Sequence, residues 1–434
     1  MNGKAWIVCI LMLGMASGLK SADKRLIDVA PGWAKNSVNV TIFRENSLVS
    51  GKNLQFIAFY DSAGYFTLGR RELKSKEWKL KKTGYRGHVS DAHNGISIML
   101  DGKGYLHASF DHHGNQLNYA VSKVPYSLNL GGLKAMTGED EKDVTYPQFY
   151  RMPNGNLIFM YRSGASGNGN LVLNSYDVQK GKWNKLQRNL IDGERKRNAY
   201  WQACVDHKGT IHLSWVWRET GDVSTNHDMC YAKSEDGGIT WEKSDGEKYK
   251  LPITAGTAEY ICRIPQKSGL INQTSMNTDG AGRPYIATYW KDKGSEVPQY
   301  HVLYYDDNKW NIKNCGFRKT PFTLSGGGTK SIPISRPQIF VRGEGSRAEV
   351  YIIYRDKERN DRVSIAVCKN LDKNLWELSD LTNFSVGSWE PSYDTELWRK
   401  EKKIHLFVQK VVQIDGEGKA SVPAEEVRVL EWQP

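Results

Sequence analysis

One pattern recurs seven times along this chain and constrains its fold more than any other feature. A first strand-like run leads through a turn into an aromatic-rich second run, then a third, and in most units a fourth that carries a tryptophan. The unit is about fifty residues long, and repeats of that length built from four short strands are typical of β-propellers. The sequence therefore predicts an all-β fold, a single seven-bladed β-propeller spanning residues 30–434.

The seventh unit is one strand short. Its three expected strands are Glu390–Trp398, Lys403–Gln409 and Glu426–Trp432. Near the N-terminus, Ser37–Phe43 alternates like a strand but has no partner nearby in the sequence. We expect this N-terminal strand to complete the last blade and close the ring, which removes open sheet edges. The rival architecture is two stacked β-sandwich domains, but no linker interrupts the repeat.

Two further patterns are structural rather than chemical. The segment 234–241, SEDGGITW, has the form of an Asp box, a hairpin whose carboxylate caps its own turn and whose Trp packs between sheets. His107 and His212 occupy equivalent positions inside second strands, and a repeated position is usually architectural. We therefore assign none of these residues a catalytic role.

The N-terminus predicts export. Residues 1–22 contain Lys4, an apolar run from Ala5 to Met15 and small residues at 16–18, which is the pattern of a cleavable signal peptide. We expect a secreted or periplasmic protein without a membrane anchor. The formal charge of +12 indicates either an acidic partner or general solubility. We expect a monomer that does not bind nucleic acid.

Cysteine usage does not indicate a disulfide framework. Five cysteines follow the signal segment, an odd number at wide spacing, which favours buried free thiols: Cys204, Cys230, Cys262, Cys315 and Cys368. His227 and Cys230 in NHDMC, together with Cys262, offer an alternative, a structural zinc site. Calcium is the other structural metal that we consider.

The candidate chemistry lies at strand ends. His93 enters the first strand of the second unit, and His113 leaves its second strand. In the fourth unit, Tyr200 and Arg218 occupy corresponding positions. Because the end of a second strand in an antiparallel meander returns to the level where the first strand begins, we expect all four side chains at one face. His112 then points away from it, and Arg218 has the alternative of pairing with Glu219 or Asp222 on the surface.

Several segments together resemble a known family. DAHNGISI, FDHHGNQLNY, RNAYWQACVDHKGTIHLSWVWRET and NHDMCYAKSEDGGITW are similar to the BNR-repeat propellers of bacterial polysaccharide utilisation. That family includes ulvan lyases and α-L-rhamnosidases that remove rhamnose from glucuronate. The resemblance to the lyase branch implies that His93, His113, Tyr200 and Arg218 are catalytic. The rhamnosidase branch resembles a one-histidine design on the opposite face, and here the matching region, FRENSLV, offers only Glu45 and Asn46.

The resemblance implies an enzyme that acts on an acidic rhamnose- and uronate-containing polysaccharide. We expect a lyase that breaks the bond to O4 of a uronate by β-elimination, which requires no cofactor. The alternatives are an α-L-rhamnosidase and a non-catalytic sugar-binding propeller. Asn94, Glu45 and Asn46 are the expected substrate-binding residues. In the lyase, Arg218 and a histidine neutralise the uronate carboxylate while Tyr200 or His93 transfers the proton.

Overall fold

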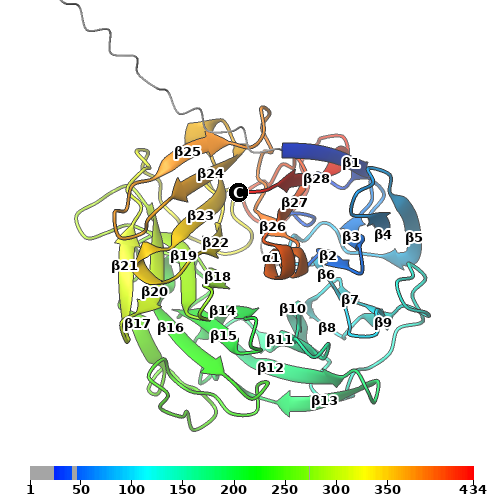
Figure 1. The fold of residues 1–434 in the computed structure, drawn as a ribbon, viewed down its shortest axis with the longest axis horizontal. Helices are drawn as coiled ribbons and strands as arrows, with labels where there is room; N and C mark the ends of the chain where they lie inside the picture. The colour runs from blue at the N-terminus through cyan, green and yellow to red at the C-terminus, as the bar shows by residue number, and fades with distance from the viewer. Residues whose placement is uncertain (1–23, 42–45, 273) are drawn as a thin grey trace, which may run out of the picture.

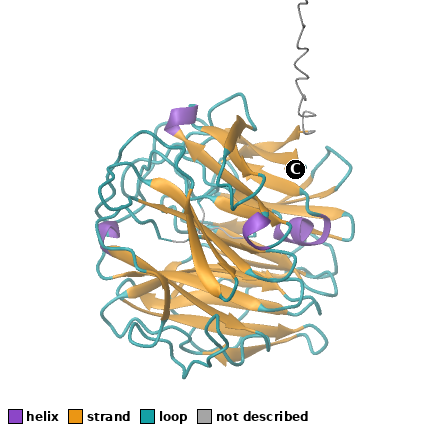
Figure 2. Cartoon of the chain, turned by 60° about the vertical axis from the view of Figure 1, so that its left-hand side comes forward, coloured by secondary structure: helices purple, strands orange, loops and turns teal. Residues whose placement is uncertain are grey.

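The computed structural model describes residues 24–41, 46–272 and 274–434. The expected signal peptide lies outside the described residues, as does Glu45. Seven antiparallel sheets are arranged around a central axis, so the predicted seven-bladed β-propeller is confirmed (Figure 1). Seen from the side, strands dominate and helix is confined to a few short turns (Figure 2). No helix of the described residues is both long and apolar enough to cross a bilayer.

The first three blades follow one another along the chain, and one short strand from the second blade joins the sheet of the third. The first blade contains β2 (Leu48–Gly51), β3 (Leu54–Tyr60), β4 (Tyr65–Glu72) and β5 (Lys79–Arg86). The second contains β6 (Ile96–Leu100), β7 (Leu106–Phe110) and β9 (Tyr119–Val121). The third contains β10 (Val144–Arg151), β11 (Leu157–Ala165), β12 (Asn168–Asp177) and β13 (Lys182–Gln187). The short strand β8 (His113–Asn115) leaves the second blade and pairs with β10 of the third.

The next three blades are regular four-stranded meanders. The fourth contains β14 (Asn198–Val205), β15 (Ile211–Arg218), β16 (Asn226–Ser234) and β17 (Glu259–Cys262). The fifth contains β18 (Ser275–Thr278), β19 (Pro284–Trp290), β20 (Gln299–Asp306) and β21 (Lys309–Asn314). The sixth contains β22 (Gln338–Arg342), β23 (Glu349–Asp356), β24 (Arg362–Cys368) and β25 (Glu377–Asp380). Single 3-10 turns lie at Val223–Thr225, Gly345–Arg347 and Lys357–Arg359.

The seventh blade closes the ring, but not with the segment we expected. It contains β26 (Ser392–Tyr393), β27 (Ile404–Val408) and β28 (Glu425–Trp432), and β1 (Lys24–Gly32) pairs with β28 as its outer strand. The prediction that Ser37–Phe43 supplies this strand is wrong. The backbone N–H groups of Val40 and Thr41 both donate to the carbonyl of Ser37, so residues 37–41 form a turn, and residues 42 and 43 lie outside the described residues. Strand β1 therefore adds residues 24–29 to the propeller, ahead of the expected start at residue 30.

Most of the expected strand Glu390–Trp398 does not form a strand. Only β26 is extended, and α1 (Thr395–Glu401) follows it at the centre of the ring (Figure 1). Asp394 caps this helix by accepting a hydrogen bond from the backbone N–H of Leu397 at 3.0 Å. The sequence TELWRKE consists largely of good helix formers, so a local capping signal overrides the repeat.

Both structural motifs behave as the sequence predicted. In the Asp box, the Asp236 carboxylate accepts hydrogen bonds from the N–H groups of Ile239 and Thr240, and Trp241 is buried. The two repeated histidines share one role. His107 bonds to the hydroxyl of Tyr119 and His212 to that of Tyr231, each at 2.7 Å. All five described cysteines are free thiols.

Candidate active site

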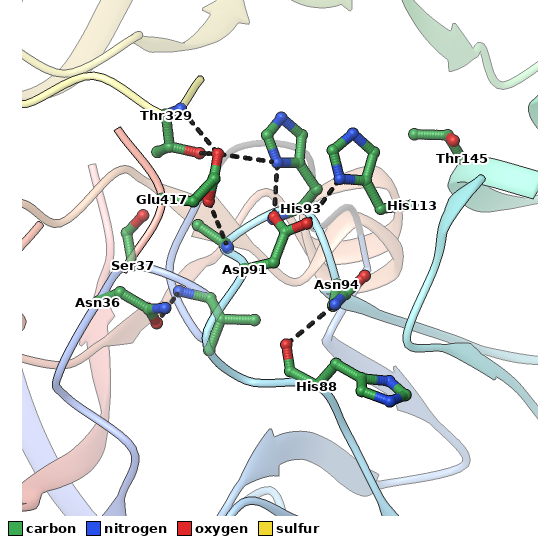
Figure 3. A network of polar contacts seen from close by, with 12 residues as sticks. Asn36, Ser37, His88, Asp91, His93, Asn94, His113, Thr145, Thr329 and Glu417 are labelled. Carbon is green, nitrogen blue, oxygen red and sulfur yellow. Dashed lines mark hydrogen bonds and ion pairs between the residues drawn. The ribbon is translucent and has the colours of Figure 1, made fainter. Parts of the chain in front are cut away.

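A pair of histidines bridged by one carboxylate forms the first part of the site (Figure 3). His93 lies in the loop between β5 and β6, and β8 begins at His113. The Nδ1 atoms of the two rings lie 2.7 Å and 2.6 Å from the two carboxylate oxygens of Asp91. The rings stack with their centroids 4.0 Å apart. The structure thus brings together the two predicted histidines and adds Asp91, which sequence reasoning missed.

Asp91 fixes the orientation of both rings. Burial by itself raises the pKa of this carboxyl group, but hydrogen bonds from His113 and His93 outweigh burial, and its pKa lies well below the ordinary value. A carboxylate that faces both Nδ1 atoms holds protons there. It leaves Nε2 on the side of each ring away from Asp91 as the nitrogen that can accept a proton.

Two long loops converge on His93 from the other side of the ring of blades. Glu417, between β27 and β28, lies with one carboxylate oxygen 3.4 Å from Nδ1 of His93. The same oxygen accepts hydrogen bonds from the backbone N–H and the hydroxyl of Thr329, each at 2.9 Å. The other oxygen accepts from the backbone N–H of Ala92 at 3.3 Å. The histidine loop is therefore tied to loops from the sixth and seventh units (Figure 3).

Tyr200 and Arg218 form the second part of the site. They lie on the two paired strands β14 and β15, where Arg218 is opposite Asn198 and Tyr200 is opposite Val216, and the Arg218 guanidinium lies 5.4 Å from the centre of the Tyr200 ring. Burial raises the pKa of Tyr200, but the charges of Arg218 and Arg162 outweigh it, so that the pKa lies below the ordinary tyrosine value. Arg218 donates to the carbonyl oxygens of Thr220 and Gly221.

The alternative pairing of Arg218 with Glu219 is not what the structure shows. Glu219 instead contacts Nε of Arg197 at 2.7 Å and Nε2 of His227 at 2.8 Å. Two basic side chains already surround this carboxylate. The second acidic neighbour, Asp222, is close enough to be affected: hydrogen bonds from the backbone of Ser224 lower its pKa, and the charge of Arg218 adds to this effect.

Tyr146 connects the two parts and was missed by the sequence analysis. Its ring centroid lies 6.0 Å from that of His93 and 6.1 Å from that of Tyr200, and the Arg162 guanidinium lies 5.1 Å from it. The backbone of Tyr146 has φ of 57° at a bulge in β10. Positive φ is a rare conformation for a bulky residue, and such strain concentrates at functional sites.

A signal for Tyr146 and Arg162 was present in the sequence. Tyr146 lies near the start of the first strand of the third blade, and Arg162 lies near the end of its second strand. These are the positions that Tyr200 and Arg218 occupy one blade further on. Tyr146 and Arg162 are therefore found when the starts of first strands and the ends of second strands are compared in every unit, and not only in the second and fourth.

The expected substrate-binding residues have structural contacts. The side-chain amide of Asn94 donates to the His88 backbone carbonyl at 2.9 Å, and the backbone carbonyl of Asn94 accepts from the hydroxyl of Tyr60. Asn46 donates to the carbonyl of Phe149 and accepts from Thr395 at the start of α1. Neither contact places the amide beside the paired histidines, so both residues are engaged in holding the blades together.

A cavity of about 260 Å³ occupies the opposite end of the axis. Asn46, the last residues of several first strands and α1 line it. Its carboxylates already have partners. Asp206 and Asp279 each accept two backbone hydrogen bonds from their own turns, and Glu396 contacts Arg399 at 2.7 Å and Arg151 at 3.6 Å. This end lacks the paired histidines and the Tyr–Arg contacts.

The proposed metal ligands are not brought together. His227 contacts Glu219 and Asp228, Cys230 is fully buried, and Cys262 pairs with Met229 across β16–β17. Within the described ranges, one group of three ligand-type side chains meets within 4.8 Å, and it is Asp91, His93 and His113. These three suit zinc by donor type, yet their facing atoms are already joined to one another by hydrogen bonds.

The chain is similar in sequence and fold to known proteins. A family model described as a BNR repeat-containing family member matches residues 54–318. An ulvan lyase of Alteromonas sp. (strain LOR) is 23% identical over 303 residues, which cover 59% of this chain and 58% of the relative. An ulvan lyase of Nonlabens ulvanivorans is 25% identical over 331 residues, covering 64% and 68%. The chain thus spans little more than half the length of the Alteromonas relative.

Solved structures extend the similarity to nearly the whole propeller. The polysaccharide lyase Uly1 superimposes with a TM-score of 0.68 at 15% identity, covering 94% of this chain and 99% of that one. An ulvan lyase bound to -[GlcA(1-4)Rha3S]- superimposes with a TM-score of 0.65 at 15% identity, covering 92% and 98%. Residues 54–318, which the family model matches, include four complete blades of the seven and all the histidines, tyrosines and arginines of the candidate site. The chain therefore belongs to the BNR repeat-containing family.

Proposed function

We propose that this protein is a polysaccharide lyase that cleaves an acidic, uronate-containing polysaccharide by β-elimination. One observation carries the proposal: two tyrosines, each with an arginine over its ring, lie beside a carboxylate-linked histidine pair at one end of the axis. Elimination at a uronate needs a cation for the carboxylate, a base for the C5 proton and an acid for the leaving oxygen. The site contains groups suited to all three roles.

The arginines neutralise charge. When the C5 proton leaves, negative charge moves onto the adjacent carboxylate, and fixed cations stabilise it most effectively in a site from which water is excluded. Arg218 and Arg162 are placed for this role because both lower the pKa of buried Tyr200. The same field that acts on the phenol acts on a uronate bound next to it.

The two tyrosines differ in acidity, which suggests a division of labour. The pKa of Tyr200 is lowered, whereas burial, together with the nearby Tyr200, raises the pKa of Tyr146. Neighbouring titratable groups whose pKa values are pushed apart are the usual basis of acid and base assignments. We assign Tyr200 as the base and Tyr146 as the proton donor, with the Nε2 atoms of His93 and His113 binding the sugar or accepting the proton in place of Tyr200.

The balance of the reaction is simple. The base takes the C5 proton, the C5–H electron pair forms the C4=C5 double bond, and the C4–O4 bond breaks. The donor protonates O4 of the departing chain. The products are an unsaturated uronate and a chain with a free hydroxyl, and no water or cofactor is consumed.

The relatives support the choice of substrate. The similar proteins are ulvan lyases, and one solved structure is bound to -[GlcA(1-4)Rha3S]-. The formal charge of +12 suits such a polyanion. Together with the signal-like residues 1–22, this supports action on a polysaccharide outside the cytoplasm.

Product analysis tests the proposal directly. The protein is incubated with ulvan, and the products are followed by ultraviolet absorbance and mass spectrometry. A lyase produces an absorbing unsaturated uronate at each new end. Saturated sugars with water added indicate a hydrolase, and an unchanged polymer that is nevertheless bound indicates a sugar-binding propeller. Either result contradicts the elimination mechanism.

A further inference from the structure

The outer strand of the first blade carries an unusual concentration of positive charge. Residues 74–86 include six basic residues and one acidic residue, Glu77, which is a net +5 out of +12 for the chain. All six basic side chains are exposed: Lys74, Lys76, Lys79, Lys81, Lys82 and Arg86. Within the part of the chain that the structure describes, only Lys82 among them forms an ion pair, with Asp61 at 3.3 Å.

Protection of a sheet edge does not account for this charge. One or two lysines on an outer strand are enough to discourage edge-to-edge pairing. Among the described outer strands, β13, β21 and β1 have two basic residues each, and β25 has two acidic ones. By contrast, β5 has four basic residues and no acidic one. The excess charge on β5 points to a partner with negative charge.

The direction of β5 connects this charge to the active site. The strand runs along the rim of the ring (Figure 1) and ends at Arg86, and the loop that follows it holds His88, Asp91 and His93. Eight extended residues span roughly 26 Å, the length of several sugar units. The basic residues therefore form a track along both faces of an outer strand, which leads from the outer edge of the first blade to the loop that holds His93.

Aromatic contact orders one end of the track. The Lys82 ammonium lies 3.8 Å from the centre of the Tyr65 ring, and the Arg86 guanidinium lies 5.8 Å from the same ring. Cation–π contacts of this kind restrict long side chains that otherwise move freely. The end of the track nearest to the site is thus the more ordered end.

We propose that this basic track, Lys74–Arg86, is a second binding surface for an acidic polysaccharide, which holds the polymer and guides it into the site next to His93. The proposal rests on the proposed function for the identity of the polymer. Strips of one charge raise the local concentration of an oppositely charged partner and speed its association. The track is expected to affect long chains and to leave short ones unaffected.

A triple variant tests this role. Lys79→Gln, Lys81→Gln and Lys82→Gln remove three charges from β5 without touching the histidine–tyrosine site. A matched control removes three exposed lysines from the fifth and sixth units: Lys309→Gln, Lys357→Gln and Lys373→Gln. Binding to immobilised ulvan is measured against salt concentration, and cleavage is measured with ulvan and with a tetrasaccharide cut from it.

We expect the β5 variant to bind ulvan about tenfold more weakly at low salt, with KM for the polymer raised to match and cleavage of the tetrasaccharide at the wild-type level. The difference should shrink as salt increases. The control variant should keep wild-type affinity and KM. If both triple variants lose binding equally, net charge rather than the track is responsible, and the proposal is wrong.

Other outcomes separate this proposal from the proposed function. If ulvan binds through β5 but is not cleaved, the track stands and the lyase assignment fails. If both triple variants cleave ulvan with the same KM, the lyase assignment stands and the basic track is not a binding surface. If the wild-type protein binds a DNA duplex as tightly as ulvan, and through the same lysines, the track is a general polyanion surface and the assignment to polysaccharide is overturned.

Discussion

The imidazole rings of His93 and His113 lie stacked, with 15° between their planes, and both Nδ1 atoms face the carboxylate of Asp91. One acidic residue therefore sets the protonation pattern of two candidate catalytic groups. This arrangement couples the rings: a change at Asp91 alters the proton that each ring holds and the direction in which its Nε2 points.

Asp91→Asn is expected to impair catalysis much more than stability. The amide keeps the size of the side chain but faces one ring with an NH2 group, so that ring must change its tautomer or rotate. General acid–base catalysis contributes about 10²–10⁴-fold, so we expect kcat/KM to fall by about 100-fold or more. The measurement is steady-state cleavage of ulvan, together with thermal denaturation.

A matched control is available in the same region. Asp111 bonds to His88 Nδ1 at 2.8 Å, but the His88 side chain is 85% exposed. Asp111→Asn breaks a His–Asp pair of the same kind without touching the stacked rings. Equal losses of activity in the two variants would show that Asp91 maintains the fold of the loop and does not orient the catalytic groups.

Tyr200→Phe and Arg218→Ala are expected to fail in different ways. Tyr200→Phe removes a proton-transfer group while leaving the ring in place, so turnover should be abolished and substrate binding largely kept. Arg218→Ala removes a charge that attracts the uronate in both the ground state and the transition state, so KM should rise while kcat falls by about 10²–10³-fold. Tyr146→Phe should behave like Tyr200→Phe.

Binding of an uncleaved oligosaccharide, measured by calorimetry beside the kinetics, separates the two effects. Full activity in Tyr200→Phe would show that Tyr200 is not the base and that His93 or Tyr146 takes the proton instead. Full activity in all three variants would move the working site to the other end of the axis, where the cavity lined by Asn46 lies. The effects need not add, because the residues act as one unit.

Most of the fold was predictable because its signal is local. Inward-facing strands alternate or run continuously apolar, as in β3 and β19, and this pattern is legible without knowledge of the tertiary structure. The closing strand β1 has little such pattern, since only Ile27 and Gly32 of its nine residues are buried. The segment that alternates, Ser37–Thr41, is a turn that is buried throughout: Val38 and Val40 pack in the core, and the polar side chains that alternate with them are equally buried and hydrogen-bonded.

The candidate site was predictable in part for the same reason. His93, His113, Tyr200 and Arg218 could be placed because strand ends in a repeat converge by topology alone. The link through Asp91 depends on which rotamers meet across a loop, and the position of Tyr146 depends on a bulge. Neither is visible in the spacing of residues. The loop that brings Glu417 to His93 is held by Thr329 of another unit, so only the folded chain shows it.

Acid is expected to destabilise this protein through three buried histidines. Burial lowers the pKa of His112 and His301 to about 4 and that of His405 to about 3. The unfolded chain, in which a histidine has a pKa of about 6.5, therefore binds more protons than the folded chain does at lower pH. The stability from these groups is fully present above about pH 6.5 and is lost as the pH falls toward 4.

Several carboxyl groups oppose them. Burial raises the pKa of Asp394 to about 6, so its contribution to stability increases as the pH falls from about 6 toward 4, and burial also raises the pKa of Glu259, Asp356 and Glu426. Burial lowers the pKa of a fourth histidine, His107, and hydrogen bonds lower the pKa of Asp91, Asp206 and Asp228 despite their burial, so we expect a net loss of stability on acidification. Denaturation midpoints between pH 7 and pH 4.5 measure it, and His405→Gln should flatten the slope whereas exposed His88→Gln should not. Equal stability across that range would contradict the assignment.

Closure of the ring by β1 makes a prediction about two adjacent side chains. Ile27 is 2% exposed and lies opposite Val429 of β28, whereas Leu26 on the other face of the strand is 40% exposed. Ile27→Ala leaves a cavity at the junction and should lower the free energy of unfolding by about 2–5 kcal/mol. Leu26→Ala removes a similar volume from the surface and should change it by less than about 0.5 kcal/mol. Chemical denaturation measures both. If the two variants lose the same stability, or if neither does, β1 does not close the propeller through the register Leu26↔Leu430 and Ile27↔Val429.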